Sequence, residues 1–131
     1  MRNLAYLACP YSTGIEDGMS YRERFVLRQQ GSVVADAAAA QLFKIEPAVY
    51  SPITHGAALE DHMDPTEAED WSQWMKSCEA FLENSHTLYV LKLVGWEKSK
   101  GVAYEINYAK RNNLKIIFVE FNENFELVIN E

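Results

Sequence analysis

Glu105 follows a strand-like run and a loop in an order that suits chemistry on anions or sugars. An apolar run over residues 88–94 leads into a polar, glycine-bounded loop over residues 95–101, and a helical pattern begins at Val102. A buried strand that feeds a loop and a helix N-terminus forms anion and sugar sites at the carboxyl edge of α/β sheets. Glu105 is therefore a candidate for a carboxylate that faces such a site.

The helical pattern places Glu105 at the edge of the apolar stripe formed by Val102, Ile106 and Ala109, in the expected first turn. A glutamate there could be a surface residue that only complements the helix dipole. It could instead point into a pocket, kept ionised by the helix N-terminus and ready to attack an electrophilic carbon. The spacing alone leaves both interpretations open.

Alternating strand and helix patterns predict an α/β protein. Strands are expected over residues 4–8, 47–52, 87–94 and 115–119, with a last short element over 125–129. Helices are expected over residues 20–43 and 101–113, and a third begins at Asp64 and Pro65 and carries Trp71, Met75, Cys78 and Leu82 on one stripe. This order predicts a three-layer sandwich, Rossmann-like or flavodoxin-like, with a four- to five-stranded mainly parallel sheet. The length of 131 residues fits a single domain over residues 1–131.

Two further expectations concern local structure. The spacing of Val26, Val33, Ala37, Ala40 and Phe43 predicts one buried face on the first helix. Residues 53–56 are expected to form a loop at the end of the second strand.

The loops that follow the strands should meet at one edge of the sheet. Those over residues 9–12, 51–56 and 95–105 bring together the polar and aromatic candidates, with Tyr6 on the first strand: Tyr11, Ser12, His55, Trp96, Ser99 and Glu105. Trp96 could be a platform on which a base stacks, or a loop anchor packed on Trp71 or Trp74. Both interpretations are equally supported.

Several common chemistries are excluded by inspection. The chain has no P-loop, no Gly-x-Gly-x-x-Gly fingerprint and no Gly-x-Ser-x-Gly elbow, and Ile15 stands where a thiol phosphatase loop beginning at Cys9 would need arginine. The acidic and histidine residues over 55–64 match no strong zinc spacing and are more simply a solvated turn. We therefore expect neither a metal nor another cofactor.

Composition sets the expected partners and location. Asp and Glu number 19 against 12 Lys and Arg, which gives a net charge of −7 and argues against binding to duplex nucleic acid. No apolar run is long enough to span a membrane and no signal-peptide pattern is present, so a cytoplasmic protein is expected. Cys9 and Cys78 are expected to be reduced thiols.

Three segments, residues 6–12, 49–56 and 91–106, together resemble the nucleoside 2-deoxyribosyltransferase and deoxynucleoside 5′-monophosphate N-glycosidase superfamily, and within it the branch called DUF1937. The stretch from Ser99 to Glu105 is similar to the superfamily's Ser-x-Gly-x-x-x-Glu signature, whose glutamate is the nucleophile. The resemblance extends over nearly the whole chain. It implies cleavage or transfer of an N-glycosidic bond in a nucleoside or nucleotide.

The resemblance also implies roles for individual residues. Glu105 would attack C1′ of a ribosyl or deoxyribosyl group and form a glycosyl-enzyme intermediate, while Tyr6 would orient that carboxylate. Ser99 and the backbone around Gly101 would bind a 5′-hydroxyl or 5′-phosphate. The remaining substrate-binding residues would be Cys9, Pro10, Tyr11, Ser12, His55 and Trp96.

The chain departs from the superfamily pattern at two positions. Cys78 stands where the glycosidases have the aspartate that protonates the leaving base, and Asp70, or else Glu79, is the nearby substitute. Ser12 stands where nucleotide-specific members have a phosphate-binding arginine, although Arg22 and Arg24 could reach back.

Transfer to water would make the protein a hydrolase, and transfer to a second base a transferase. A hydrolase of NAD or ADP-ribosyl compounds and a non-catalytic nucleotide sensor are the alternatives. The resemblance further implies a homodimer or larger assembly.

Overall fold

A single five-stranded sheet organises the computed structural model, which describes residues 2–11 and 14–130. The strands lie in the order β2-β1-β3-β4-β5. Their bounds are β1 (Leu4–Ala8), β2 (Val49–Tyr50), β3 (Ser85–Leu91), β4 (Lys115–Phe121) and β5 (Leu127–Asn130). The first four strands are parallel, and β5 pairs antiparallel with β4. The α/β fold class and the mainly parallel sheet predicted from the sequence are confirmed.

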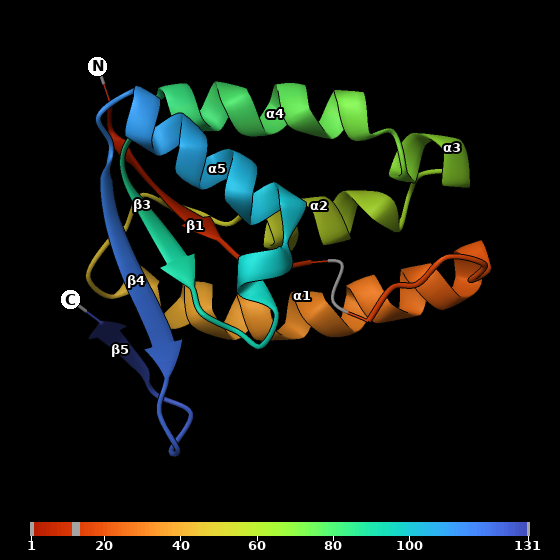
Figure 1. Cartoon of the computed structure of the whole chain (residues 1–131), viewed down its shortest axis with the longest axis horizontal. Coiled ribbons are helices and arrows are strands. Elements are labelled where there is room, and N and C mark those ends of the chain that lie inside the picture. The colour runs from red at the N-terminus through yellow and green to blue at the C-terminus, as the bar shows by residue number, and fades with distance from the viewer. Residues whose placement is uncertain (1, 12–13, 131) are drawn as a thin grey trace.

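Helices cover both faces of this sheet. They are α1 (Tyr21–Phe43), α2 (Pro52–Glu60), α3 (Pro65–Ala68), α4 (Trp71–Glu83) and α5 (Lys100–Arg111), with a short 3₁₀ helix η1 (Trp96–Lys98). In Figure 1, α1 runs along one face of the sheet, and α4 and α5 run along the other. The predicted three-layer sandwich is therefore confirmed. Among the described residues, no helix combines the length and apolar character needed to cross a membrane.

The alternation of side chains along β1 decides which layer each residue meets. Ala5 and Leu7 belong to the core that contains α1, whereas Tyr6 and Ala8 belong to the core on the α4 and α5 side. All four side chains are fully buried. Tyr6 therefore faces the helical layer to which Glu105 belongs.

The buried face of α1 is not the one predicted. Val33 is 66% exposed and Phe43 is 58% exposed. The buried residues are instead Arg28, Ser32, Ala35, Ala38 and Leu42. The stripe prediction failed because small and polar residues form the buried face, so the larger apolar side chains marked the wrong one.

The predicted loop over residues 53–56 is also wrong, because these residues lie in α2. Ser51 is the N-cap, where its hydroxyl accepts a hydrogen bond from the backbone N–H of Thr54 at 3.4 Å, and Pro52 occupies the first turn. A Ser-Pro pair is the same start signal that Asp64 and Pro65 give for α3.

The helix predicted to begin at Asp64 is interrupted. It ends after Ala68, and α4 begins at Trp71 with Asp70 as its N-cap. The break leaves the backbone carbonyl of Ala68 free to accept a hydrogen bond from the indole Nε1 of Trp74 at 2.8 Å. Glu69, at the junction, is held by Arg24 of α1 through two hydrogen bonds of 2.7 and 2.6 Å. The junction thus joins α4 to α1 across the end of the sheet.

The third strand both begins and ends earlier in the chain than predicted, over Ser85–Leu91 in place of residues 87–94. It ends at Leu91, and Val94 is 92% exposed in the loop that follows. The apolar residues that follow Leu91 therefore lie outside the sheet.

The exposure pattern of α1 gives a stability prediction. Leu42→Ala should lower the free energy of unfolding by about 2–5 kcal/mol because it opens a cavity under the sheet. Val33→Ala, on the exposed face, should change it by less than about 0.5 kcal/mol. Urea denaturation followed by circular dichroism measures both, and equal losses would contradict the observed orientation of the helix.

Candidate functional site

Two adjoining cavities lie where the carboxyl ends of β1 and β3 meet the surrounding helices. They measure about 260 and 840 Å³ and share Cys9, Tyr11, Trp71 and Gly101 in their walls. The strand β1 lies between β2 and β3, so the chain order reverses at this point of the sheet. Such switch points are where open α/β sheets bind ligands.

Glu105 lines the smaller cavity and is only 7% exposed. Its carboxylate forms no ion pair with the described part of the chain, and the nearby Tyr6 hydroxyl lowers the Glu105 pKa less than burial raises it. Burial without a compensating cation raises the pKa of Glu105 to about 8. The surface interpretation of this glutamate is therefore excluded.

The predicted effect of the helix dipole on Glu105 is wrong. Because α5 begins at Lys100, Glu105 lies in the second turn, and no acidic residue lies in the first. The influence of the dipole fades within the first turn. The expectation that the helix N-terminus keeps this carboxylate ionised therefore does not hold in the unliganded protein.

Tyr6 lies beneath the cavity, beside Glu105 and Cys78. Its side chain is fully buried, and its hydroxyl forms no hydrogen bond with any described residue. Burial, followed by the neighbouring charge of Glu105, holds the pKa of the Tyr6 hydroxyl well above its usual value. A buried hydroxyl without a partner is costly, so a small shift of this one toward Glu105 would be favourable.

The two cysteines are free thiols, as predicted, and both line the smaller cavity. Burial raises the pKa of Cys78, and also that of Cys9, so both thiols are neutral at physiological pH.

Arg28 and two glutamates form a charged cluster at the α1 side of the smaller cavity. The guanidinium of Arg28 donates from Nε to Glu60 Oε1 at 3.2 Å and from Nη1 to Glu69 Oε2 at 2.8 Å. The hydroxyl of Tyr11 donates to Glu60 Oε2 at 3.1 Å. Arg28 is 7% exposed and Glu60 is 4% exposed. Burial raises the pKa of Glu60 although Arg28 opposes the shift.

The sequence does not predict this cluster. Arg28 lies outside the face of α1 that the apolar spacing predicts to be buried, and Glu60 belongs to the acidic segment predicted to be a solvated turn. Among the described residues, no group of three or more His, Cys, Asp or Glu side chains could hold a metal ion.

Two tryptophans of α4 form part of the wall of the smaller cavity. Trp71 and Trp74 both line it, and Trp71 also lines the larger cavity while remaining 59% exposed. Their spacing of three residues, with Cys78 four residues later, puts all three on one side of the helix. This spacing is the sequence pattern that could have predicted a wall of tryptophans on this helix.

The larger cavity is bordered by the N-terminus of α5. Ser99 is the N-cap, and its hydroxyl oxygen accepts a hydrogen bond from the backbone N–H of Val102 at 3.2 Å. Pro10, Lys98, Ser99, Lys100 and Gly101 line this cavity. Backbone N–H groups and two lysines make it the more suitable of the two for an anion.

Besides Tyr6, three predicted site residues lie outside the walls of both cavities. Asp70 is exposed, and its carboxylate accepts a hydrogen bond from the backbone N–H of Gln73 at 3.2 Å. His55 is exposed on α2 with its ring 5.8 Å from that of Tyr50. Trp96 packs against Phe118, with ring centroids 5.5 Å apart, so it anchors the loop. Ser12 lies outside the described residues.

Glu79, the other candidate to replace the missing acid, is also engaged in a hydrogen bond. Its carboxylate accepts a hydrogen bond from the hydroxyl of Tyr104. Tyr104 lines the smaller cavity, whereas Glu79 does not.

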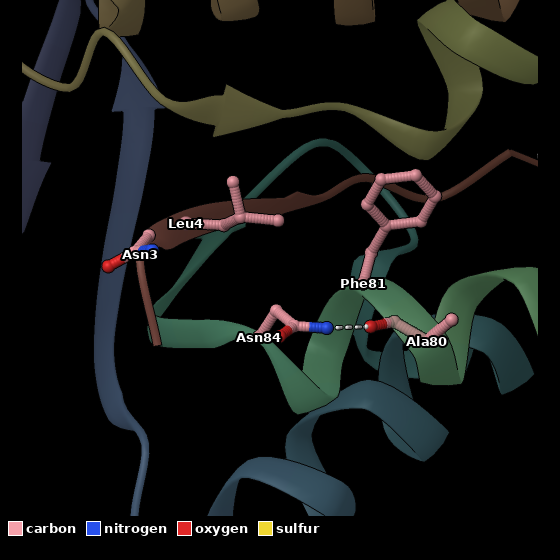
Figure 2. Close-up of a pocket in the computed structure, with 5 residues that line it drawn as sticks. All are labelled: Asn3, Leu4, Ala80, Phe81 and Asn84. Carbon is pink, nitrogen blue, oxygen red and sulfur yellow. Dashed lines mark hydrogen bonds between the residues drawn. The ribbon is translucent and has the colours of Figure 1, made fainter. Parts of the chain in front are cut away.

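A third hollow, of about 390 Å³, lies at the amino end of β1. Figure 2 shows its lining residues, Asn3, Leu4, Ala80, Phe81 and Asn84. The amide of Asn84 donates to the backbone carbonyl of Ala80 at 2.8 Å. Because no titratable side chain lines this hollow, it offers no acid, base or nucleophile.

The fold and the cavities define an α/β protein with a buried carboxylate at the carboxyl edge of its sheet. Residues 3–121 match the model of a family described as "Domain of unknown function (DUF1937)". The chain belongs to this family. No curated protein matches the chain.

The raised pKa of Glu105 gives a prediction that needs no substrate. The unfolded protein ionises this group near pH 4.5, whereas the folded protein ionises it near pH 8, so folding stability should fall as pH rises between these values. Glu105→Gln should remove this loss and be more stable than the wild type by roughly 2–4 kcal/mol at pH 8, with little difference at pH 4.5. Urea denaturation across this pH range tests the prediction. A pH-independent difference would contradict the burial of an uncompensated carboxylate.

Proposed function

We propose that this protein cleaves or transfers the N-glycosidic bond of a nucleoside or nucleotide, with Glu105 as the nucleophile. The observation that carries the proposal is the buried, unpaired carboxylate of Glu105 in the wall of a cavity at the sheet's switch point. The Ser99 to Glu105 motif supports it, because it is similar to the signature of the nucleoside 2-deoxyribosyltransferase and N-glycosidase superfamily.

The reaction proposed is a double displacement at C1′. A carboxylate oxygen of Glu105 bonds to C1′ as the C1′–N bond breaks, and the electron pair leaves with the base. Water or a second base then attacks C1′ and releases Glu105. A nucleophile must be ionised, and the positive charge that develops on the sugar favours the ionised form of Glu105 in the transition state.

The two cavities suit two parts of such a substrate. The smaller one contains Glu105 and the tryptophan wall of α4, which suits a sugar and a planar base. The larger one contains the N-terminus of α5, with Ser99 and two lysines, which suits a 5′-hydroxyl or 5′-phosphate. Tyr6 would orient Glu105 by a hydrogen bond formed when substrate binds.

A specific feature favours a second candidate, hydrolysis of NAD or ADP-ribosyl compounds. Cys78, a neutral thiol, stands where an acid would protonate the leaving base, and the carboxylate of Asp70 caps α4. The nicotinamide of NAD leaves as a neutral molecule and needs no acid. The same C1′ chemistry by Glu105 would serve both substrates.

The proposal is tested by incubating the protein with deoxynucleosides, ribonucleosides, their 5′-monophosphates and NAD, and measuring free base by chromatography. At least one substrate should release its base, and Glu105→Gln should lower kcat by about 10³-fold or more. Glu97→Gln, at an exposed glutamate in the preceding η1, is the matched control and should leave kcat unchanged.

Failure of every substrate, or unchanged turnover in Glu105→Gln, would overturn the enzymatic proposal. In the first case, a rise in melting temperature with one of these ligands would identify a non-catalytic sensor instead.

The Tyr6→Phe variant distinguishes a role of the hydroxyl in orienting Glu105 from a role in the stability of the protein. Removing a buried hydroxyl that has no partner should leave the protein as stable as the wild type or more stable by about 1 kcal/mol. The same change should lower kcat by about 10- to 100-fold if the hydroxyl orients Glu105. Thermal denaturation and the base-release assay measure the two effects, and full activity would remove Tyr6 from the mechanism.

A further inference from the structure

Arg28 lines the smaller cavity and holds an unused hydrogen-bond donor. Its Nε and Nη1 atoms bind Glu60 and Glu69, whereas its buried Nη2 atom has no hydrogen-bond partner among residues 2–11 and 14–130. A buried guanidinium N–H without a partner is costly. The two ion pairs fix the guanidinium. Neighbouring atoms cover Nη2 in this structure, so a small shift of the cavity wall is needed before it can donate to a ligand.

The neighbouring Glu60 supplies an acceptor in the same wall. It is 4% exposed, and its position is fixed by Arg28 and by the hydroxyl of Tyr11. These contacts do not use the full acceptor capacity of a carboxylate. A donor and an acceptor therefore stand side by side and match a ligand edge that carries a carbonyl next to an N–H.

The charge of the cluster excludes a phosphate as its ligand. Glu60 and Glu69 lie within 3.2 Å of Arg28 and offset its charge, so a phosphate there would meet two carboxylates. The N-terminus of α5 and its lysines offer an anion a better place in the larger cavity. The ligand edge at Arg28 is therefore neutral.

The direction from which Glu105 would attack C1′ indicates that Arg28 and Glu60 lie near the leaving base. The helices α5 and α1 lie on opposite faces of the sheet (Figure 1). Glu105 of α5 and Arg28 of α1 nevertheless line the same cavity. A nucleophile attacks C1′ from the side opposite the leaving group. With the sugar at Glu105, the base extends toward the α1 side, where Arg28 and Glu60 stand.

We propose that Arg28 and Glu60 bind the leaving base by a ring carbonyl and an adjacent ring N–H, so that the site selects oxo bases such as uracil, thymine, hypoxanthine and guanine. Arg28 Nη2 donates to the carbonyl oxygen, and Glu60 accepts from the ring N–H. Adenine and cytosine lack this pair of groups. The inference rests on the proposed function and names its substrate class.

The same contact gives Arg28 a part in the reaction. As the C1′–N bond breaks, the electron pair on the base nitrogen spreads to the ring carbonyl, and the N–H of Arg28 stabilises the charge there. Water then supplies the proton that the released base takes up. Arg28 thus assists departure of the base in a site where Cys78 stands in place of an acid.

The test compares the wild type with Arg28→Lys, which keeps a cation for both glutamates but removes the Nη2 donor. Release of base is measured from 2′-deoxyinosine, 2′-deoxyuridine, 2′-deoxyadenosine and 2′-deoxycytidine. The wild type should prefer the first two, and Arg28→Lys should lower kcat/KM for them by roughly 10- to 100-fold while changing the others little. Arg24→Lys, one turn earlier on α1 and also paired with Glu69, is the matched control and should keep the wild-type preference.

Binding of the free bases separates failure of this inference from failure of the proposed function. Saturation-transfer NMR with hypoxanthine, uracil and adenine requires no turnover, and the first two should bind the wild type and lose binding in Arg28→Lys. That result without turnover of any nucleoside would overturn the enzymatic proposal and support base selection. Preference for 2′-deoxyadenosine, or an equal loss for all four nucleosides in a folded Arg28→Lys protein, would overturn base selection.

Discussion

The carboxylate of Glu105 is buried at the carboxyl edge of the sheet without an ion pair to any of the described residues. Such a group costs stability, and the protein relieves the cost by favouring the protonated form, which raises the pKa of Glu105 to about 8. The groups around Glu105 fit this preference for the protonated form. Tyr6 and Cys78 approach the carboxylate with neutral groups, and the cavity leaves room for a ligand whose charge could restore the ionised form.

The layers of the fold give the cavity two chemically different sides. The α5 side supplies Glu105, and the α1 side supplies Arg28 with its two glutamates. The break between α3 and α4 connects them, because Glu69 at the junction binds α1 and Trp74 in α4 forms part of the wall. Helices on both faces of the sheet therefore place Glu105, the proposed nucleophile, and the Arg28 cluster, the proposed base-binding group, around one cavity.

The sequence was sufficient to predict the sheet, because strong apolar runs decide it, and it identified Glu105 as a candidate while leaving its burial open. It was insufficient to predict which residues the α1 side contributes to the cavity. Arg28 is polar and so counted against burial, yet two ion pairs compensate its charge inside the fold. The role of Asp70 as a helix cap also depended on a break that no glycine or proline marks. Tertiary contacts, rather than local pattern, decided these features.

Covalent trapping tests the central claim most directly. Nucleosides with fluorine at C2′ slow the release of a glycosyl-enzyme, so the protein is incubated with 2′-deoxy-2′-fluoro analogues of inosine and uridine, quenched in acid, digested and analysed by mass spectrometry. The account predicts one peptide heavier by the fluorinated sugar, with the added mass on Glu105. Release of base with Glu105 unmodified and the sugar attached to another residue would contradict it.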